Sequence, residues 1–167
     1  NGFARVYVLA NEIIANSDAK IDMNDLIEYL MAYQTQKYLE IEEIWEINIF
    51  LQIAIIEKIR HICEKIFVSQ MQKCKVDDIV KRLVEGKIDS KFEKLFKSKT
   101  LNGEYEFVEY MSYKLKRYGK DAVPYLEALE EETNKIGMTV STIIEREHFD
   151  VAVKRLSMKN CITSLKV

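Results

Sequence analysis

The stretch that decides the fold is INIFLQIAII, residues 47–56, which carries no charge and is apolar at eight of its ten positions. A helix that is apolar on all sides has to be covered on all sides. Helical spacing continues outward from this stretch, through Ile44 and Trp45 before it and Ile59 and Ile62 after it. We therefore predict a long central helix over residues 41–67, wrapped by other helices, with Trp45 in its core-facing stripe.

Two helices are predicted before this segment. Residues 5–16, RVYVLANEIIAN, have apolar side chains at helical spacing. Asp22 is a suitable N-cap for a second helix. The inner face of that helix is predicted to hold Leu26, Ile27, Leu30 and Met31.

Several shorter helices are predicted after it. Residues 76–84 form a short amphipathic pattern that stops near Gly86. Residues 89–96, DSKFEKLF, suggest one or two further helical turns, and residues 97–104, KSKTLNGE, are a charged loop containing Asn-Gly.

The last third of the chain predicts three helices, over residues 104–118, 121–135 and 140–165. Pro124 falls in the first turn of the second, where a missing N–H costs little. Gly119 and Gly137 stand where C-cap glycines belong, and Thr139 caps the last helix. The predicted fold is therefore all-α, with about seven to eight helices around the central apolar helix and no convincing strand.

The size and composition fit one globular helical domain. The chain has 167 residues, of which 48% are apolar, and only five glycines and one proline. Strand-and-turn folds need many chain reversals, so this scarcity favours long helices. We expect residues 1–167 to be a single domain, and because the chain starts at Asn1 rather than Met, a fragment of a much larger multidomain protein.

The charge and the cysteines exclude several classes of function. The net charge of −2 provides no general attraction to nucleic acid or anionic lipid. Cys63, Cys74 and Cys161 are an odd number without a Cys-x-x-Cys pair, which argues against a disulfide framework and for a reducing compartment. Residues 47–56 are far shorter than the roughly 20 residues that cross a bilayer. We expect no membrane span and no nucleic-acid partner.

Glu145 and His148 have the spacing of a half-site in carboxylate-bridged metal bundles. His148 borders an apolar stripe and could face inward. A complete site needs a second Glu-x-x-His pair, and the other histidine, His61, follows Glu57 by four residues rather than three. We expect a structural boundary histidine and no metal site.

Other chemical constellations are missing from the sequence. Adjacent carboxylates on a helix diverge by about 100° and do not converge on one substrate atom. The chain has no Gly-rich phosphate loop and no Gly-x-Ser-x-Gly turn. Cys63 lies on an apolar stripe and is predicted to be buried and inert. We expect no catalytic residue and no cofactor.

Aromatic and basic residues alternate over residues 105–118, and such surfaces can stack on sugars or bases. The simpler interpretation is that Tyr110 and Tyr113 are packing residues. A ligand or docking surface, if the chain has one, is predicted to involve Trp45, Tyr110, Tyr113 and Arg117.

Three stretches together resemble cyclic β-1,2-glucan synthetases, the family of glycosyltransferase family 36 and glycoside hydrolase family 94 type. The first is RVYVLANEIIANSDAKID, continuing into LIEYLMAYQ; the second is IEEIWEINIFLQIAIIEKIRHI; the third comprises GMTVSTIIEREH and MKNCITSL. The second is similar to the family's Gly-Glu-Leu-Trp followed by Ala-Leu-Ile-Glu-Asn-Leu-Arg, and the third to Gly-Asn-x-Ile-Thr-Ser-Leu. The chain departs from the family at Asn16, at residues 46–48 and at Lys159, which stands in place of a glycine.

The resemblance spans nearly the whole chain and implies the helical region upstream of a membrane-embedded transferase. The parent would transfer glucose from UDP-glucose into glucan and trim the product with a phosphorylase-like module. The transferase motifs Asp-x-Asp and Gln-x-x-Arg-Trp are missing here, since Trp45 follows Ile44. The resemblance thus implies a non-catalytic accessory domain on the cytoplasmic face of the inner membrane.

Three functions follow as hypotheses. The first is an accessory domain that docks against the other domains of the parent glycosyltransferase. The second is a carbohydrate-binding module that holds β-glucan or primer through Trp45 or the tyrosine face. The third is a metal-binding helical bundle built on Glu145 and His148.

Overall fold

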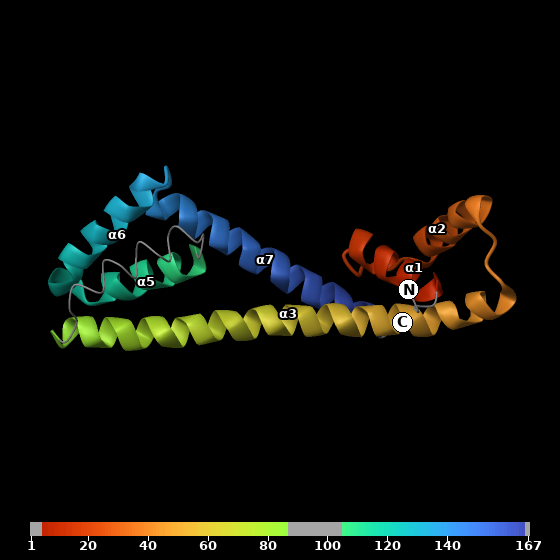
Figure 1. Ribbon diagram of the computed structural model, residues 1–167, viewed down its shortest axis with the longest axis horizontal. Helices are drawn as coiled ribbons and strands as arrows, with labels where there is room; N and C mark the ends of the chain where they lie inside the picture. The colour runs from red at the N-terminus through yellow and green to blue at the C-terminus, as the bar shows by residue number, and fades with distance from the viewer. Residues whose placement is uncertain (1–4, 87–104, 166–167) are drawn as a thin grey trace. The chain divides into compact units, whose positions relative to one another are not determined.

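The computed structural model describes residues 5–86 and 105–165, and all the regular structure in these residues is helical (Figure 1). This confirms the all-α class. The described residues form six α-helices and one 3-10 helix, and the prediction of seven to eight helices is slightly off because two predicted helices, 41–67 and 76–84, are one. The helix at 89–96 and the loop at 97–104 lie outside the described residues. The elements are α1 (Arg5–Asn16), α2 (Met23–Gln36), α3 (Ile41–Val84), α5 (Tyr105–Arg117), η1 (Gly119–Ala122), α6 (Val123–Lys135) and α7 (Val140–Ser164).

The helix boundaries follow the local capping chemistry. The Asp22 carboxylate accepts a hydrogen bond from the backbone N–H of Asn24 at 2.8 Å, which caps α2 as predicted. Thr139 Oγ1 accepts one from the N–H of Thr142 at 3.3 Å before α7. Gly119 and Gly137 have φ angles of +70° and +72°, the left-handed conformation of a C-cap glycine.

The chain divides into two compact units, which are described separately below. Unit 1 comprises Asn1–Glu64 and Val153–Val167, and unit 2 comprises Lys65–Ala152. Helices α3 and α7 therefore each contribute residues to both units. Each unit has its own cluster of buried apolar side chains.

The core of unit 1 lies between α1, α3 and the C-terminal end of α7. Helix α1 buries Val6, Leu9, Ala10, Ile13 and Ile14, all at helical spacing. These pack with Leu51, Ile55 and other residues of α3 and with Cys161 of α7. The residues that α3 contributes to this core therefore lie mostly on one face of the helix.

The prediction that residues 47–56 are covered on all sides is wrong. Ile55 is 1% exposed, but Ile49 and Ile56 are 58% and 57% exposed. The helices of unit 1 pack on one side of α3, and the apolar residues of the opposite side stay at the surface. The long apolar helix exists, but it is not enclosed by the others.

Helix α2 also differs from its prediction. Leu26 and Leu30 are partly buried against the core of unit 1, but none of the residues of α2 is fully buried. Ile27 and Met31, which the spacing places on the inner face, are exposed. Helix α2 thus contacts the core of unit 1 only through partly buried side chains.

Unit 2 is built from the second part of α3, α5, η1, α6 and the first part of α7. Val76 and Val80 of α3 pack with Met111 and Leu115 of α5 and with other buried residues of the unit. Pro124 stands at the start of α6, as predicted. Among the described residues, no helix is both long enough and apolar enough to cross a membrane.

Candidate functional site

The most connected polar cluster of unit 1 is centred on Asp18, in the turn between α1 and α2. Its carboxylate accepts hydrogen bonds from Lys58 Nζ of α3 at 2.6 Å and from Ser157 Oγ of α7 at 2.8 Å. Its backbone carbonyl accepts one from Asn160 Nδ2 at 3.3 Å. The cluster therefore links three segments that are far apart in the chain.

The turn at Asp18 is held in an unusual conformation by these contacts. Asp18 and Ala19 have φ angles of 49° and 58°, in the left-handed region that side chains with a Cβ rarely adopt. Ser164 Oγ donates to the carbonyl of Ala19 at 2.5 Å, and Lys58 Nζ donates to the carbonyl of Ile14 at 3.3 Å. Such strain persists where the surrounding structure over-determines the backbone.

The Asp18 carboxylate and the Lys58 ammonium form an ion pair. The ammonium of Lys58 lowers the pKa of Asp18, and hydrogen bonds from Ser157 and Asn160 act in the same direction, while burial opposes them. The neighbouring Cys161 is buried, which raises the pKa of its thiol. The Asp18 carboxylate, which accepts both hydrogen bonds on Oδ1, therefore links the turn to α3 and α7.

Sequence reasoning missed this cluster. Asp18, Lys58 and Asn160 are far apart in the sequence, and no local spacing relates polar residues that only the tertiary fold brings together. The cluster shows that the end of RVYVLANEIIANSDAKID, the end of IEEIWEINIFLQIAIIEKIRHI and the stretch MKNCITSL meet within unit 1.

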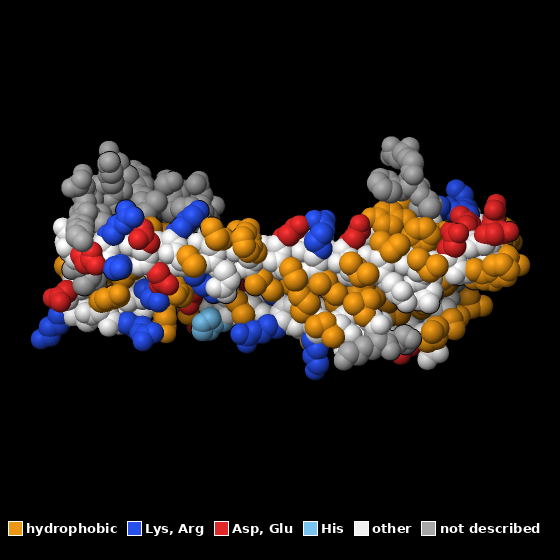
Figure 2. All heavy atoms as spheres, turned by 90° about the horizontal axis from the view of Figure 1, so that it is seen from below, with side chains coloured by type: hydrophobic (Ala, Val, Ile, Leu, Met, Phe, Trp, Pro, Cys, Tyr) orange, Lys and Arg blue, Asp and Glu red, His pale blue; other side chains and the backbone are white. Residues whose placement is uncertain are grey.

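The second feature of unit 1 is an exposed apolar surface on two consecutive helices. We call it the α2–α3 surface, and Figure 2 shows apolar side chains gathered along α3 in this unit. On α3, its members recur every three or four residues, which places them on one side of the helix. The surface comprises Met23, Ile27 and Met31 of α2 and Ile41, Trp45, Ile49, Ile53 and Ile56 of α3.

A groove adjoins this surface. It has a volume of about 410 Å³, which lies in the range of ligand sites. Leu26 and Leu30 line it from α2, and Leu51 and Ile55 line it from α3. Its lining is mostly apolar, so it suits apolar side chains better than a charged or sugar-like ligand.

Trp45 lies within the α2–α3 surface, and its predicted place in the core is wrong. The side chain is 74% exposed. Periodicity placed it on the same stripe as Ile41 and Ile44, and both of these are exposed as well. The stripe is apolar, but the core of unit 1 packs against the neighbouring face of α3.

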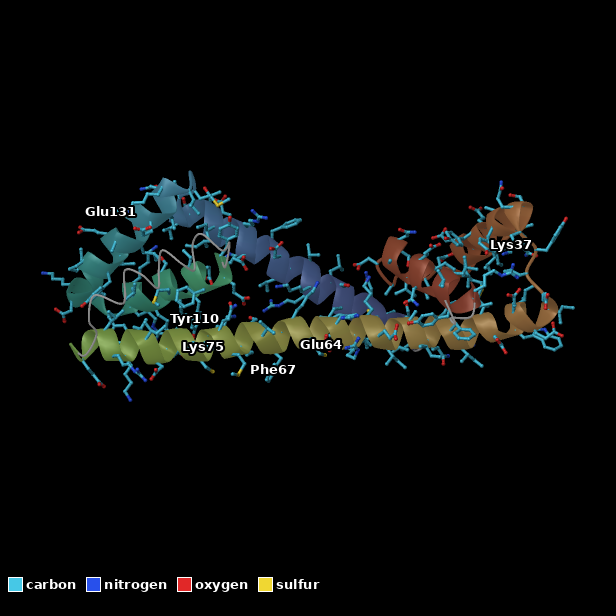
Figure 3. All side chains as sticks on the ribbon, viewed as in Figure 1. Lys37, Glu64, Phe67, Lys75, Tyr110 and Glu131 are labelled. Carbon is cyan, nitrogen blue, oxygen red and sulfur yellow. The ribbon has the colours of Figure 1, made fainter. Side chains whose placement is uncertain are left out.

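Tyr110, Tyr113 and Arg117 come together on α5 in unit 2, and Trp45 belongs to the other unit. The two tyrosine rings stack with centroids 6.1 Å apart. Lys73 and Lys114 lie over the Tyr110 ring, at 5.6 and 5.2 Å from its centroid, and Arg117 lies 5.8 Å from that of Tyr113. Figure 3 shows Tyr110 between α5 and α3. Each ring thus already has a cation of the same unit beside it.

The two residues of the candidate metal half-site lie at the surface. Glu145 and His148 are both exposed on α7, so His148 does not face the core. Within residues 5–86 and 105–165, no group of three or more His, Cys, Asp or Glu side chains could hold a metal ion. Cys63, predicted to be buried, is exposed because its side of α3 is not covered.

Comparisons of this chain with protein-family models, curated proteins and solved structures find no match.

Proposed function

We propose that this chain is a non-catalytic helical accessory domain of a cyclic glucan synthetase-like glycosyltransferase, and that it docks onto other domains of the parent through the α2–α3 surface. The parent transfers glucose from UDP-glucose into glucan, and the domain lies on the cytoplasmic face of the inner membrane. Its contribution is to position or regulate the catalytic modules.

The observation that carries this proposal is the exposed apolar surface of unit 1. Eight large apolar side chains of α2 and α3 are between 39% and 74% exposed. Large exposed apolar patches mark interaction sites in folded proteins, and the members on α3 lie on one side of that helix. The same unit buries other residues of α3 completely, so the exposure is not the result of a missing core.

The size of the hydrophobic contribution is sufficient for docking. Full burial of one large aliphatic side chain contributes about 1.5–3 kcal/mol. Eight side chains that are already about half buried would therefore contribute roughly 6–12 kcal/mol when covered. That range offsets much or all of the estimated association cost of about 4–15 kcal/mol.

The arrangement of polar groups supports a non-catalytic role. Asp18 Oδ1 accepts hydrogen bonds from Lys58 and Ser157, and Tyr110 and Tyr113 of α5 lie beside cations of their own unit. The groove beside the α2–α3 surface is lined mainly by aliphatic side chains. A group that activates a sugar phosphate would need a converging polar site instead.

The test is docking in trans. The chain is mixed with the remaining domains of the parent enzyme, and complex formation is measured by isothermal titration calorimetry. We expect saturable binding that is lost in a Trp45→Ser/Ile49→Ser variant and kept in a Phe67→Ser/Phe149→Ser control, since Phe67 and Phe149 are exposed apolar residues outside the surface. Equal binding by both variants, or turnover of UDP-glucose by the isolated chain, contradicts the proposal.

A second candidate function is binding of β-glucan, favoured by the exposed indole ring of Trp45. Sugars stack on exposed aromatic rings, and the resemblance points to a glucan-forming parent. Titration with a β-1,2-glucooligosaccharide, followed by tryptophan fluorescence, distinguishes this function from docking. An absence of saturable change at about 10 mM sugar removes it for the isolated chain.

A further inference from the structure

We propose that the partner segment on the α2–α3 surface is an amphipathic helix with an apolar face and basic flanks. This inference rests on the proposed docking function and names the chemistry of the occupant. It is carried by the apolar lining of the groove and by the acidic residues that α2 and α3 expose beside the α2–α3 surface.

The groove offers apolar contacts from two helices. Its walls come from two helices, with Leu26, Ile27 and Leu30 on one side and Leu51 and Ile55 on the other. Helix-in-groove recognition seats apolar anchors at positions i, i+3, i+4 and i+7 of the incoming helix. A volume of about 410 Å³ holds a few such aliphatic side chains.

The groove offers few hydrogen-bonding side chains. Asn48 and Gln52 line it from α3, four residues apart on one side of that helix, and both are exposed. Their amides can bond polar side chains of a bound helix. They do not supply the set of donors and acceptors that an extended β-strand would require from its partner.

The charge beside the α2–α3 surface selects the flanks of the occupant. Seven acidic residues lie within residues 22–46, and Lys37 is the only basic residue in this range. Glu43 is paired with Arg5, while Asp25, Glu28, Glu42 and Glu46 are exposed on α2 and α3. Figure 2 shows acidic side chains gathered near the end of the molecule where α3 begins. Complementary potentials speed association and suppress partners of like charge.

The same charge argues against two other occupants. An anionic bilayer attracts basic segments, and this surface has an acidic border. A second copy of the chain would bring the two acidic borders together at neutral pH, which like-charge repulsion opposes. A basic amphipathic helix complements both the apolar groove and the acidic residues beside the α2–α3 surface.

The experiment uses three synthetic helical peptides of equal length and the full chain. The first has leucine at positions i, i+3, i+4 and i+7 and lysine at the remaining surface positions. The second has the same composition in an order that gives no apolar face, and the third has glutamate in place of lysine. Binding is followed through the fluorescence of Trp45, the single tryptophan of the chain.

We expect saturable binding of the first peptide, weakened by added salt, and no saturable binding of the other two below about 1 mM. A Glu42→Gln/Glu46→Gln variant should bind the first peptide about threefold to tenfold more weakly. A Glu127→Gln/Glu131→Gln control changes two exposed acids of α6 in unit 2 and should bind like the unmodified chain.

Several results would overturn the inference. Equal binding of the lysine and glutamate peptides, or no binding of either, would show that the border does not select a basic helix. Binding of the chain to anionic phospholipid vesicles that exceeds its peptide affinity would assign the surface to a membrane. Self-association that is lost in the Trp45→Ser/Ile49→Ser variant, measured by analytical ultracentrifugation, would assign it to a second copy.

The two proposals fail in different ways. If the parent's other domains bind the chain through Trp45 and Ile49 but the basic peptide does not, only the identity of the partner segment is wrong. If those domains bind without regard to Trp45 and Ile49, the docking surface itself is wrong.

Discussion

Asp18 connects parts of unit 1 that lie up to 142 residues apart in the chain. Its backbone and side chain together contact α3 and α7 while the turn between α1 and α2 holds two residues in the left-handed conformation. We interpret this cluster as the brace that fixes the start of α2 relative to the core of unit 1. The α2–α3 surface therefore depends on a residue outside it.

Replacing Asp18 by Asn should destabilise the chain by about 1 kcal/mol near neutral pH. The variant keeps an acceptor but loses the ion pair with Lys58, and because the Asp18 side chain is 48% exposed, solvent screens part of the interaction. The measurement is urea unfolding followed by circular dichroism. Glu131→Gln, an exposed change on α6, should leave the unfolding midpoint unaltered.

The stabilities of the unmodified chain and of Asp18→Asn should also depend differently on pH. Since Lys58 lowers the pKa of Asp18 in the folded chain, its stabilisation is complete above the ordinary value of 3.8 and is lost as the pH falls through the lowered value. The stability difference between the chain and Asp18→Asn should thus be constant near neutrality and shrink below pH 3.8. A difference that stays constant down to pH 2, or that grows there, contradicts the ion pair.

The three cysteines should react at two distinct rates. Cys63 and Cys74 are exposed, whereas Cys161 is fully buried with its thiol pKa raised by that burial. A chromogenic disulfide reagent should therefore modify two thiols rapidly and the third only as the chain unfolds. Rapid modification of Cys161 in the folded chain, identified by mass spectrometry, would show that the core of unit 1 is open.

Predictions for single residues were confirmed where they depend only on nearby backbone groups. The N-caps Asp22 and Thr139 and the C-cap glycines Gly119 and Gly137 depend on a few neighbouring backbone groups, which the sequence displays directly. The burial of Trp45 and Cys63 depends on whether another helix packs against their side of α3. Their spacing identified an apolar side of α3 but could not say whether another helix covers it.

At the scale of elements, α3 carries the main difference between prediction and structure. The sequence suggests helices at 41–67 and 76–84 with a break between them, and the structure has one helix from Ile41 to Val84. Five of the eight intervening residues, 68–75, are polar, and the other three, Val68, Met71 and Cys74, are exposed, so the segment continues the helix without burying an apolar stripe. Periodicity detects burial, and a solvent-exposed helical segment gives little of that signal.

A proline at Gln70 tests the continuity of α3. In a helix interior, proline removes a hydrogen bond and clashes with the preceding turn, at a cost of about 3 kcal/mol or more. We expect Gln70→Pro to lower the free energy of unfolding by about that amount, and Gln70→Ala, at the same exposed position, to change it by less than about 0.5 kcal/mol. If proline is tolerated as well as alanine, the segment is a turn rather than a helix.

At the scale of the whole molecule, the chain has two cores and a large apolar surface in one of its units. The all-α class followed from composition and spacing, which are properties of the chain as a whole. The candidate site followed only in part: Trp45 was named as a docking residue, but its neighbours on α2 and α3 were assigned to the core. The sequence does not distinguish an apolar side chain that packs within this chain from one that contacts a partner.

The measurement that tests the docking account most directly is the fluorescence of Trp45, because the single tryptophan lies in the α2–α3 surface and is 74% exposed. In the free chain we predict emission typical of an indole in water and efficient quenching by acrylamide. When the remaining domains of the proposed parent, with their own tryptophans replaced by phenylalanine, are added to saturation, the emission should move to shorter wavelength and the quenching should fall. A complex that forms while Trp45 keeps both its emission maximum and its quenching would contradict the account.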